Sequence, residues 1–393
     1  MEKSQKRNVF IITAVALYFT YFIHGIGVSI LAQYKQEFAK AWGGNIGLVL
    51  QVSSVLGLGR LLALPFAGPM SDKLGRKITA VFGIFMYLVF FLGMARSRSL
   101  GAAYVYGIIG GAANSFLDTS VIPSVLEIFE DRGDVASMFT KFSMSLGQFV
   151  LPFGIGIVAK NSLSYRSLFY LAAILLALDG ILILFLNFPK FGASENSLVE
   201  DRMKFDSGSI SLILIGFTAT ATFQLWLNCN QELGLLYGMA DPSKVQSLYA
   251  LGTVCAILFS SFFMLKKFKP VEVLVIYPFI SLLSLIAVYF IRTALMMKLG
   301  GFLMGFFAAG GVLQLVTSTA NAMYPKNKGK ITSIVMMASS IGSYIVLFLA
   351  GKITDFYGAS GPLKVVLLNI VVTILGVVLA LHVRRKFRQE EAR

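Results

Sequence analysis

The chain is poor in charge and in side chains that bind metals or form disulfides. Only 13% of its 393 residues are charged, about half the share usual in a soluble domain. The two cysteines, Cys229 and Cys255, both lie within apolar runs, so no disulfide framework is predicted. No Gly-rich Lys-Ser/Thr loop and no Cys/His metal spacing occur in the sequence. We therefore expect no direct use of ATP, no cofactor and no metal.

Apolar residues dominate instead. They make up 56% of the sequence, and the mean hydropathy is +0.77. A soluble protein of this size would expose too much apolar surface, so we predict a polytopic membrane protein. The loops are too short to hold a catalytic domain, which argues against an enzyme. The net charge of +15 comes from basic residues spread over short loops, a pattern that favours anionic lipid as a partner over nucleic acid.

Twelve apolar runs are long enough to cross a membrane as helices, since a span needs about 20 apolar residues and bare backbone in lipid must satisfy its own hydrogen bonds. We therefore predict an all-α membrane protein. The runs are 9–31, 45–70, 78–96, 101–129, 135–159, 166–188, 209–238, 244–265, 271–292, 295–323, 331–352 and 362–383.

The twelve predicted spans divide into two groups of six. The longest polar stretch, 189–208, separates residues 1–188 from residues 209–393 and is predicted to be a cytoplasmic linker. Gly110-Gly111 in span 4 parallels Gly310-Gly311 in span 10, as expected for two pseudo-symmetric six-helix bundles. With the N-terminus inside, basic residues are about twice as frequent on the inner side, which places both termini in the cytoplasm and the protein in the cell membrane.

A charged island, Gly68–Lys77, separates spans 2 and 3. Its charged side chains cannot lie in hydrocarbon, so we predict a tight loop at a membrane face. Gly75 would allow a strained turn, and Asp72 would lie near the positive end of the next helix. The alternative is a solvated basic turn that only determines topology.

Gly68, Asp72, Gly75, Arg76 and Lys77 resemble, position for position, the loop 2–3 signature of the major facilitator superfamily. Arg132 matches the loop 4–5 pattern more weakly. The resemblance implies alternating access between two bundles and a cytoplasmic latch formed by these six residues, with Asp72 facing the start of span 11. The corresponding loop after span 8, residues 265–270, lacks the aspartate and the glycines.

Polar residues inside the first six spans are candidates for coupling, because ionisable groups at this depth are costly. Asp118 lies about 15 Å from the end of span 4 and shares a face with Asn114. Asp118 and His24 are the proposed proton carriers, and Tyr21 and Asn114 are substrate candidates; the alternative for Asp118 and His24 is helix–helix hydrogen bonding. Arg60 would bind an anionic substrate, pair with a carboxylate such as Asp118, or snorkel.

Two other charged residues lie within spans of the first half. Asp179 in span 6 would neutralise a buried base or carry protons, but a structural role is favoured because span 6 is peripheral in this family. Lys141 in span 5 is expected to snorkel toward the inner face.

Polar residues in the second half suggest a substrate site. Gln224, Asn228 and Gln231 share a face of span 7, and amides suit hydroxyl, carbonyl and carboxylate groups. Trp226 would stack on a ligand or pack in the core. Gln314, Thr317 and Asn321 share a face of span 10, where they would bind substrate or join helices.

These features together predict a monomeric secondary active transporter that moves a small polar organic solute, driven by protons. Its substrate would be a sugar, a carboxylate or an amino-acid-like metabolite. The first alternative is a proton-driven multidrug or metabolite efflux antiporter; Leu151 and Ile155 stand where the span 5 pattern of antiporters has glycines. The second is a membrane receptor or sensor, which the lack of long soluble loops disfavours.

Overall fold

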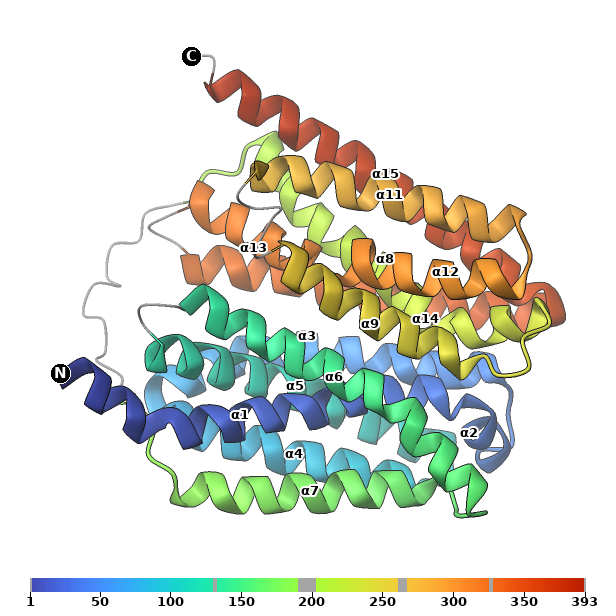
Figure 1. The fold of residues 1–393 in the computed structure, drawn as a ribbon, viewed down its shortest axis with the longest axis horizontal. Coiled ribbons are helices and arrows are strands. Elements are labelled where there is room, and N and C mark those ends of the chain that lie inside the picture. Colours follow the sequence, from blue (N-terminus) through green and yellow to red (C-terminus); the bar gives the residue numbers. More distant parts are fainter. Residues whose placement is uncertain (1, 130–132, 190–202, 261–266, 325–327, 392–393) are drawn as a thin grey trace. The chain divides into compact units, whose positions relative to one another are not determined.

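The structure, a computed structural model, describes residues 2–129, 133–189, 203–260, 267–324 and 328–391 (Figure 1). These residues form helices joined by short connections, with no strand among them. Each predicted span coincides with helical structure, which confirms the all-α membrane architecture. Ten stretches of the described chain are long and apolar enough to cross a membrane. The last of them, Lys330–Gln389, includes two of the predicted spans, and the shorter apolar helix Ser243–Phe259 is another.

The first six spans correspond to six helices whose ends lie within four residues of the predicted ones, except that α1 begins seven residues earlier. They are α1 Glu2–Gln33, α3 Ile46–Leu74, α4 Arg76–Arg96, α5 Leu100–Ile128, α6 Gly133–Lys160 and α7 Arg166–Phe185. A short helix that we did not predict, α2 Lys35–Ala41, joins α1 to α3.

The second six spans correspond to α8 Ser207–Leu236, α9 Ser243–Phe259, α11 Pro270–Phe290, the α12–α13 segment, α14 Lys328–Tyr357 and α15 Gly361–Glu391. The prediction of one continuous helix over 295–323 is wrong. The segment consists of α12 Ala294–Met304, the π-helix η3 Gly305–Ala309 and α13 Val312–Met323. Gly311, with φ of 113°, interrupts it, because only glycine adopts this conformation without strain.

The chain separates into two compact units. Unit 1 comprises Met1–Gly44 and Val55–Leu198, and unit 2 comprises Asn45–Ser54 and Val199–Arg393. Within unit 1, α1 packs on α6 and α7, and α4 packs on α5 and α7. Within unit 2, α8 packs on α14 and α15, α11 packs on α15, and α9 packs on α12 and η3. Each unit has its own buried core, with large side chains such as Tyr87 and Phe91 in unit 1 and Tyr277 in unit 2.

The predicted tight loop at Gly68–Lys77 is mostly helical. Helix α3 continues to Leu74, and α4 starts at Arg76. Gly75 alone makes the joint, with φ of 93° and ψ of 156°, a region open essentially only to glycine. Asp72 lies in the last turn of α3, and its carboxylate reaches the start of α4 by accepting a hydrogen bond from the Arg76 side chain.

Candidate functional site

Three helices of unit 1 bring a charged group together within the membrane-spanning region. The Arg60 guanidinium from α3 lies 2.7 Å from Oδ2 of Asp118 on α5. The hydroxyl of Tyr21, on α1, donates to Oδ1 of Asp118 at 2.6 Å. Each carboxylate oxygen therefore accepts one hydrogen bond from these side chains. Arg60 and Asp118 keep 22% and 20% of their side-chain surface exposed, so the pair is accessible to a small solute or to water.

The packing of α3 on α5 positions this ion pair. A Cβ at Gly111 would collide with the backbone carbonyl of Leu56, so a glycine is needed for the two helices to approach this closely. Ser115, one turn along α5, donates its hydroxyl to the Arg60 carbonyl oxygen at 2.8 Å. These contacts hold the backbone of Arg60 beside the turn of α5 that carries Asp118. Of the three roles predicted for Arg60, the structure displays pairing with Asp118.

His24 extends the group along α1. Its side chain is only 4% exposed, and its ring lies between those of Tyr21 and Tyr87, with centroids 5.4 Å from each. The Nδ1 atom is buried and has no hydrogen-bond partner among the described residues. His24 is thus a buried imidazole one turn from Tyr21, with a ring nitrogen available to a proton or to a ligand.

Lys141 lies on α6 one turn before Met144, whose backbone carbonyl packs against Gly25, next to His24 on α1. Its half-buried side chain is within electrostatic range of Asp118, Arg60 and His24, so it belongs to the same group, whereas we predicted that it snorkels toward the inner face. No side chain of the described residues pairs with it within hydrogen-bonding distance. Asn114, one turn before Asp118 on α5, has its Oδ1 buried without a partner in the part of the chain that the structure describes. We call Tyr21, His24, Arg60, Asp118 and Lys141 the charged cluster.

The predicted latch residues form a separate network at the α3–α4 joint. Arg76 is buried and donates to Asp72 at 2.7 Å, to the Ser71 hydroxyl at 2.7 Å and to Glu127 at 3.3 Å. Glu127 lies at the end of α5, so the network joins α3, α4 and α5. Asp72 itself is 60% exposed. Gly68 is part of α3, Lys77 is half-buried in the first turn of α4, and Arg132 lies outside the described residues.

Some amide groups on the predicted substrate face of α8 make hydrogen bonds within their own helix. Nδ2 of Asn228 donates to the Gln224 carbonyl oxygen at 3.0 Å and to Gln224 Oε1 at 3.1 Å. Gln231 lies half-buried one turn further along. Trp226 is 3% exposed and packs against Gly300 of α12. Packing, one of its two predicted roles, accounts for the position of this ring.

The three residues predicted on α13 differ in what they contact. Thr317 donates to the carbonyl oxygens of Gln314, at 2.8 Å, and of Leu313, at 3.2 Å, both in its own helix. Asn321 accepts a hydrogen bond from Thr332 of α14 at 3.0 Å, so it joins helices. Gln314 is half-buried, and its side chain makes no hydrogen bond to the described residues. It remains the strongest substrate candidate on this helix.

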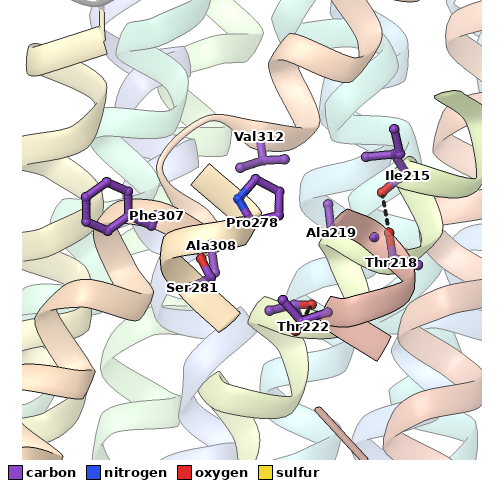
Figure 2. Close-up of a pocket in the computed structure, with 11 residues that line it drawn as sticks. Ile215, Thr218, Ala219, Thr222, Pro278, Ser281, Phe307, Ala308 and Val312 are labelled. Carbon is purple, nitrogen blue, oxygen red and sulfur yellow. Dashed lines mark hydrogen bonds between the residues drawn. The ribbon is translucent and has the colours of Figure 1, made fainter. Parts of the chain in front are cut away.

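Unit 2 also contains a small cavity beside the π-helix η3 (Figure 2). Thr218 and Thr222 of α8, Pro278 and Ser281 of α11, and Phe307 of η3 contribute to its walls. Its volume of about 10 Å³ suits one water molecule at most. None of the residues that we predicted from the sequence lines this cavity, which is too small for a solute.

Sequence reasoning missed Tyr87, Glu127 and the role of Lys141. Asp118 and Glu127 are the only acidic residues in the sequence of predicted span 4. A search for acidic partners of Arg76 would therefore have found Glu127. Tyr87 carries no signal in an aromatic-rich run. The predicted structural role of Asp179 has a physical basis, because it is 5% exposed and accepts a hydrogen bond from Thr20 at 2.6 Å.

Comparison with known proteins identifies the family. A sequence profile for the Major Facilitator Superfamily matches residues 17–240 and 208–393. This chain belongs to that superfamily. Its members are membrane transport proteins rather than enzymes, and the resemblance drawn from the Gly68–Lys77 segment is confirmed.

Individual relatives agree with this assignment. The uncharacterized MFS-type transporter YfkL of Bacillus subtilis is 29% identical over 389 residues, covering 96% of this chain and 97% of YfkL. The inner membrane transport protein YdiN of Escherichia coli is 30% identical over 386 residues, covering 95% and 90% of the two chains. The quinolone resistance protein NorA of Staphylococcus aureus is 21% identical over 377 residues, covering 93% and 95%.

Solved structures show the same fold. The crystal structure of a D-xylose–proton symporter superimposes with a TM-score of 0.73 at 14% sequence identity, covering 95% of this chain and 97% of the symporter. The chain is therefore a multi-pass membrane transporter with the major facilitator fold.

Proposed function

We propose that this protein is a proton-coupled secondary transporter that moves a small polar organic solute across the cell membrane by alternating access. The observation that carries the proposal is the Arg60–Asp118 ion pair with Tyr21 on the second carboxylate oxygen. Such a carboxylate has two stable arrangements. Ionised, it neutralises Arg60; protonated, it releases the guanidinium for another partner.

Proton coupling follows from the cost of leaving one charge of the pair unpaired. Removing one partner of a buried ion pair typically costs about 3–5 kcal/mol. Protonation of Asp118 would leave the positive charge of Arg60 without a counter-charge. It would therefore favour either the binding of a substrate or a change of conformation that opens the site to the other side of the membrane. A transporter can use this dependence to tie solute movement to proton movement.

A polar solute is favoured by the amides outside the charged cluster. Gln314 offers both donors and an acceptor and makes no side-chain hydrogen bond to the described residues. Gln231 and the Gln224–Asn228 pair add further amide groups on α8. Hydroxyl, carboxylate and amino groups of a small metabolite would satisfy Gln314, whereas a large apolar drug would leave this side chain without a hydrogen bond to the solute at a cost.

The test is reconstitution of the purified protein into proteoliposomes with an imposed pH gradient. A panel of radiolabelled sugars, carboxylates and amino acids should include solutes that accumulate or are expelled when the gradient is applied. Collapse of the gradient with a protonophore should abolish this movement, and a sodium gradient should not replace it. Transport that responds to neither gradient contradicts proton coupling. Transport that responds to the sodium gradient alone contradicts it as well.

Proton-driven efflux of drugs is the second candidate function. The similarity to NorA, a quinolone resistance protein, over 93% of this chain favours it. The absence of two glycines at Leu151 and Ile155 counts against it. Inverted membrane vesicles energised with protons should accumulate a fluorescent quinolone if efflux is the function. No quinolone movement alongside gradient-driven metabolite transport would exclude it.

We further propose that both termini lie in the cytoplasm and that the protein acts as a monomer. The excess of basic residues in alternate loops supports this orientation. The orientation can be tested with fused reporters, each of which is active on only one side of the membrane. A reporter that is active in the cytoplasm should be active when it is fused to either end of the chain. A C-terminal fusion active only outside would contradict the orientation, and mass photometry in nanodiscs would test the oligomeric state.

A further inference from the structure

The charged cluster holds more positive than negative charge. Arg60 and Lys141 each carry one positive charge, and Asp118 is the carboxylate that faces them. Any proton on His24 would add to the excess. Both oxygens of Asp118 already accept a hydrogen bond, one from Tyr21 and one from Arg60.

Lys141 is the second cation of the cluster, which has one carboxylate for two cations. It lies eight residues after the first residue of α6, about 12 Å along the helix. Its side chain is half-buried and makes no ion pair or hydrogen bond with the described residues. A charged side chain at membrane depth costs roughly 2.5–3.5 kcal/mol even on insertion scales, so a lysine kept beside a second cation requires a physical reason.

We propose that Lys141 is the binding site for the carboxylate of an organic monoanion, the substrate class of this transporter. An ammonium group offers three donors and a compact charge, which suits a carboxylate. One negative charge would neutralise the cluster. An uncharged solute would leave the excess charge in place, and a dianion would exceed it by one.

A second observation points to a ligand at the same place. The buried Nδ1 of His24 has no partner among the described residues, and its ring is within electrostatic reach of Lys141 and Asp118. An imidazole nitrogen with no partner costs free energy unless something satisfies it. A carboxylic acid or hydroxyl group on a bound solute would provide that partner.

The inference rests on the proposed transport function, but it makes a separate claim about charge. The test uses two series of compounds, each with one skeleton and three charges. They are succinamide, succinamate and succinate, and terephthalamide, terephthalamate and terephthalate. Isothermal titration calorimetry on the full-length protein in lipid nanodiscs measures their binding at low and at high ionic strength.

In at least one series, the monoanion should bind at least about tenfold more tightly than the uncharged diamide, because a hydrogen bond to a charged group contributes about 1.5–3 kcal/mol. It should also bind more tightly than the dianion, and its affinity should fall as salt rises. If no monoanion binds, or if the diamides bind equally well, the monoanion site is overturned.

Variants of α6 locate the site. Lys141→Gln should reduce the preference for monoanion over diamide about tenfold, and Lys141→Arg should retain most of it. Lys160→Gln removes the same charge from an exposed position at the end of the same helix and should change nothing. The preference is a ratio within one protein, so partial misfolding does not imitate its loss. An unchanged ratio in Lys141→Gln, or an equal loss in Lys160→Gln, overturns the assignment to Lys141.

Failure of this proposal differs from failure of the proposed function. Gradient-driven movement of an uncharged solute alone would uphold proton-coupled transport and overturn the monoanion site. Monoanion binding that depends on Lys141, together with transport that ignores the pH gradient, would uphold the site and contradict proton coupling.

Discussion

The two units differ in the chemistry that they place inside the membrane. Unit 1 places charged groups there, namely Arg60, Asp118 and Lys141. In unit 2 the positions 200 residues after Asn114 and Asp118 are Gln314 and Ser318, both uncharged. Ser318 is exposed, and its hydroxyl donates to the Leu315 carbonyl oxygen of its own helix, its one hydrogen bond to the described residues. At these matching positions the two halves therefore differ, with a charged group in one and neutral hydrogen-bonding groups in the other.

The largest expected effect comes from removing the carboxylate of the charged cluster. Asp118→Asn should reduce gradient-driven uptake by about a hundredfold or more while sparing counterflow exchange, because an amide cannot exchange the proton that couples the two movements. Uptake and counterflow in proteoliposomes measure both. Ser318→Ala at the matching position of unit 2 should leave both rates unchanged. An equal loss of gradient-driven uptake in the two variants would contradict the proposed difference between the units.

The next effect is on stability, at the α3–α4 joint of unit 1. Arg76→Gln should lower the free energy of unfolding by about 3–5 kcal/mol, because it leaves Glu127 and Asp72 without their common cation. Equilibrium unfolding in mixed micelles measures it. Lys73→Gln, an exposed neighbour, should cost under about 0.5 kcal/mol. Similar costs for both would show that the joint is merely a solvated basic turn.

The backbone of that joint gives a smaller effect. Gly75→Ala should cost about 1–3 kcal/mol, because φ of 93° with ψ of 156° is strained for any residue with a Cβ. Gly68→Ala is the matched control: it lies within α3 with open space around a Cβ, so it should be neutral or stabilising by up to about 1 kcal/mol. The same unfolding measurement applies, and a stabilised Gly75→Ala protein would contradict the geometry.

In unit 2 we expect a change in substrate affinity without a change in coupling. Gln314→Ala should raise the apparent KM roughly twofold to tenfold, the loss of about one hydrogen bond, and the dependence of uptake on the pH gradient should persist. Thr317→Val removes a hydroxyl that bonds only within its own helix and should have little effect on KM. Loss of coupling in Gln314→Ala would assign coupling to both units.

The smallest effect concerns the edge of unit 2, where Asp206 caps α8. Amide donors from Ser209 and Gly208 hold the pKa of this carboxyl below its usual range. Because the pKa is lower in the folded protein, Asp206 stabilises it above the unfolded pKa, about 4, and this stabilisation disappears as the pH falls through the folded value. Asp206→Ala should cost about 1 kcal/mol at neutral pH.

Comparing unfolding at neutral and acidic pH tests this prediction. Asp206→Asn retains an acceptor for the cap but does not titrate, so the difference between it and the wild-type protein should shrink as the pH falls. A difference that grows on acidification would contradict the sign of the shift.

Paired glycines show how a sequence repeat can mislead. Gly110-Gly111 and Gly310-Gly311 look equivalent in the sequence, but Gly111 allows two helices to approach, whereas Gly311 interrupts one helix with a positive φ. Glycine is needed in each case for a different reason, and only the backbone geometry distinguishes them. The repeat therefore predicted two related halves but not the break in span 10.

The sequence by itself determined that the chain crosses the membrane repeatedly, where its spans lie and which family it belongs to. Those properties depend on the local length of apolar runs and on one short motif, so no distant contact is needed to recognise them. The tertiary structure decided which polar residues act together. Arg60 meets Asp118 across 58 residues and Tyr21 meets it across 97.

The Gly68–Lys77 segment shows the same division. Its charges predicted a loop, because the local partners Asp72 and Ser71 do not reveal that Arg76 is buried. In the folded unit Glu127, 51 residues away, is a third partner of Arg76, and α3 continues as a helix to Leu74. Lys141, predicted to reach toward the membrane surface, instead lies one turn from the place where α6 packs against Gly25 of α1, within electrostatic range of Asp118 and Arg60. Compensation of buried charge comes from residues that only folding brings close, and for that reason a single sequence does not reveal it.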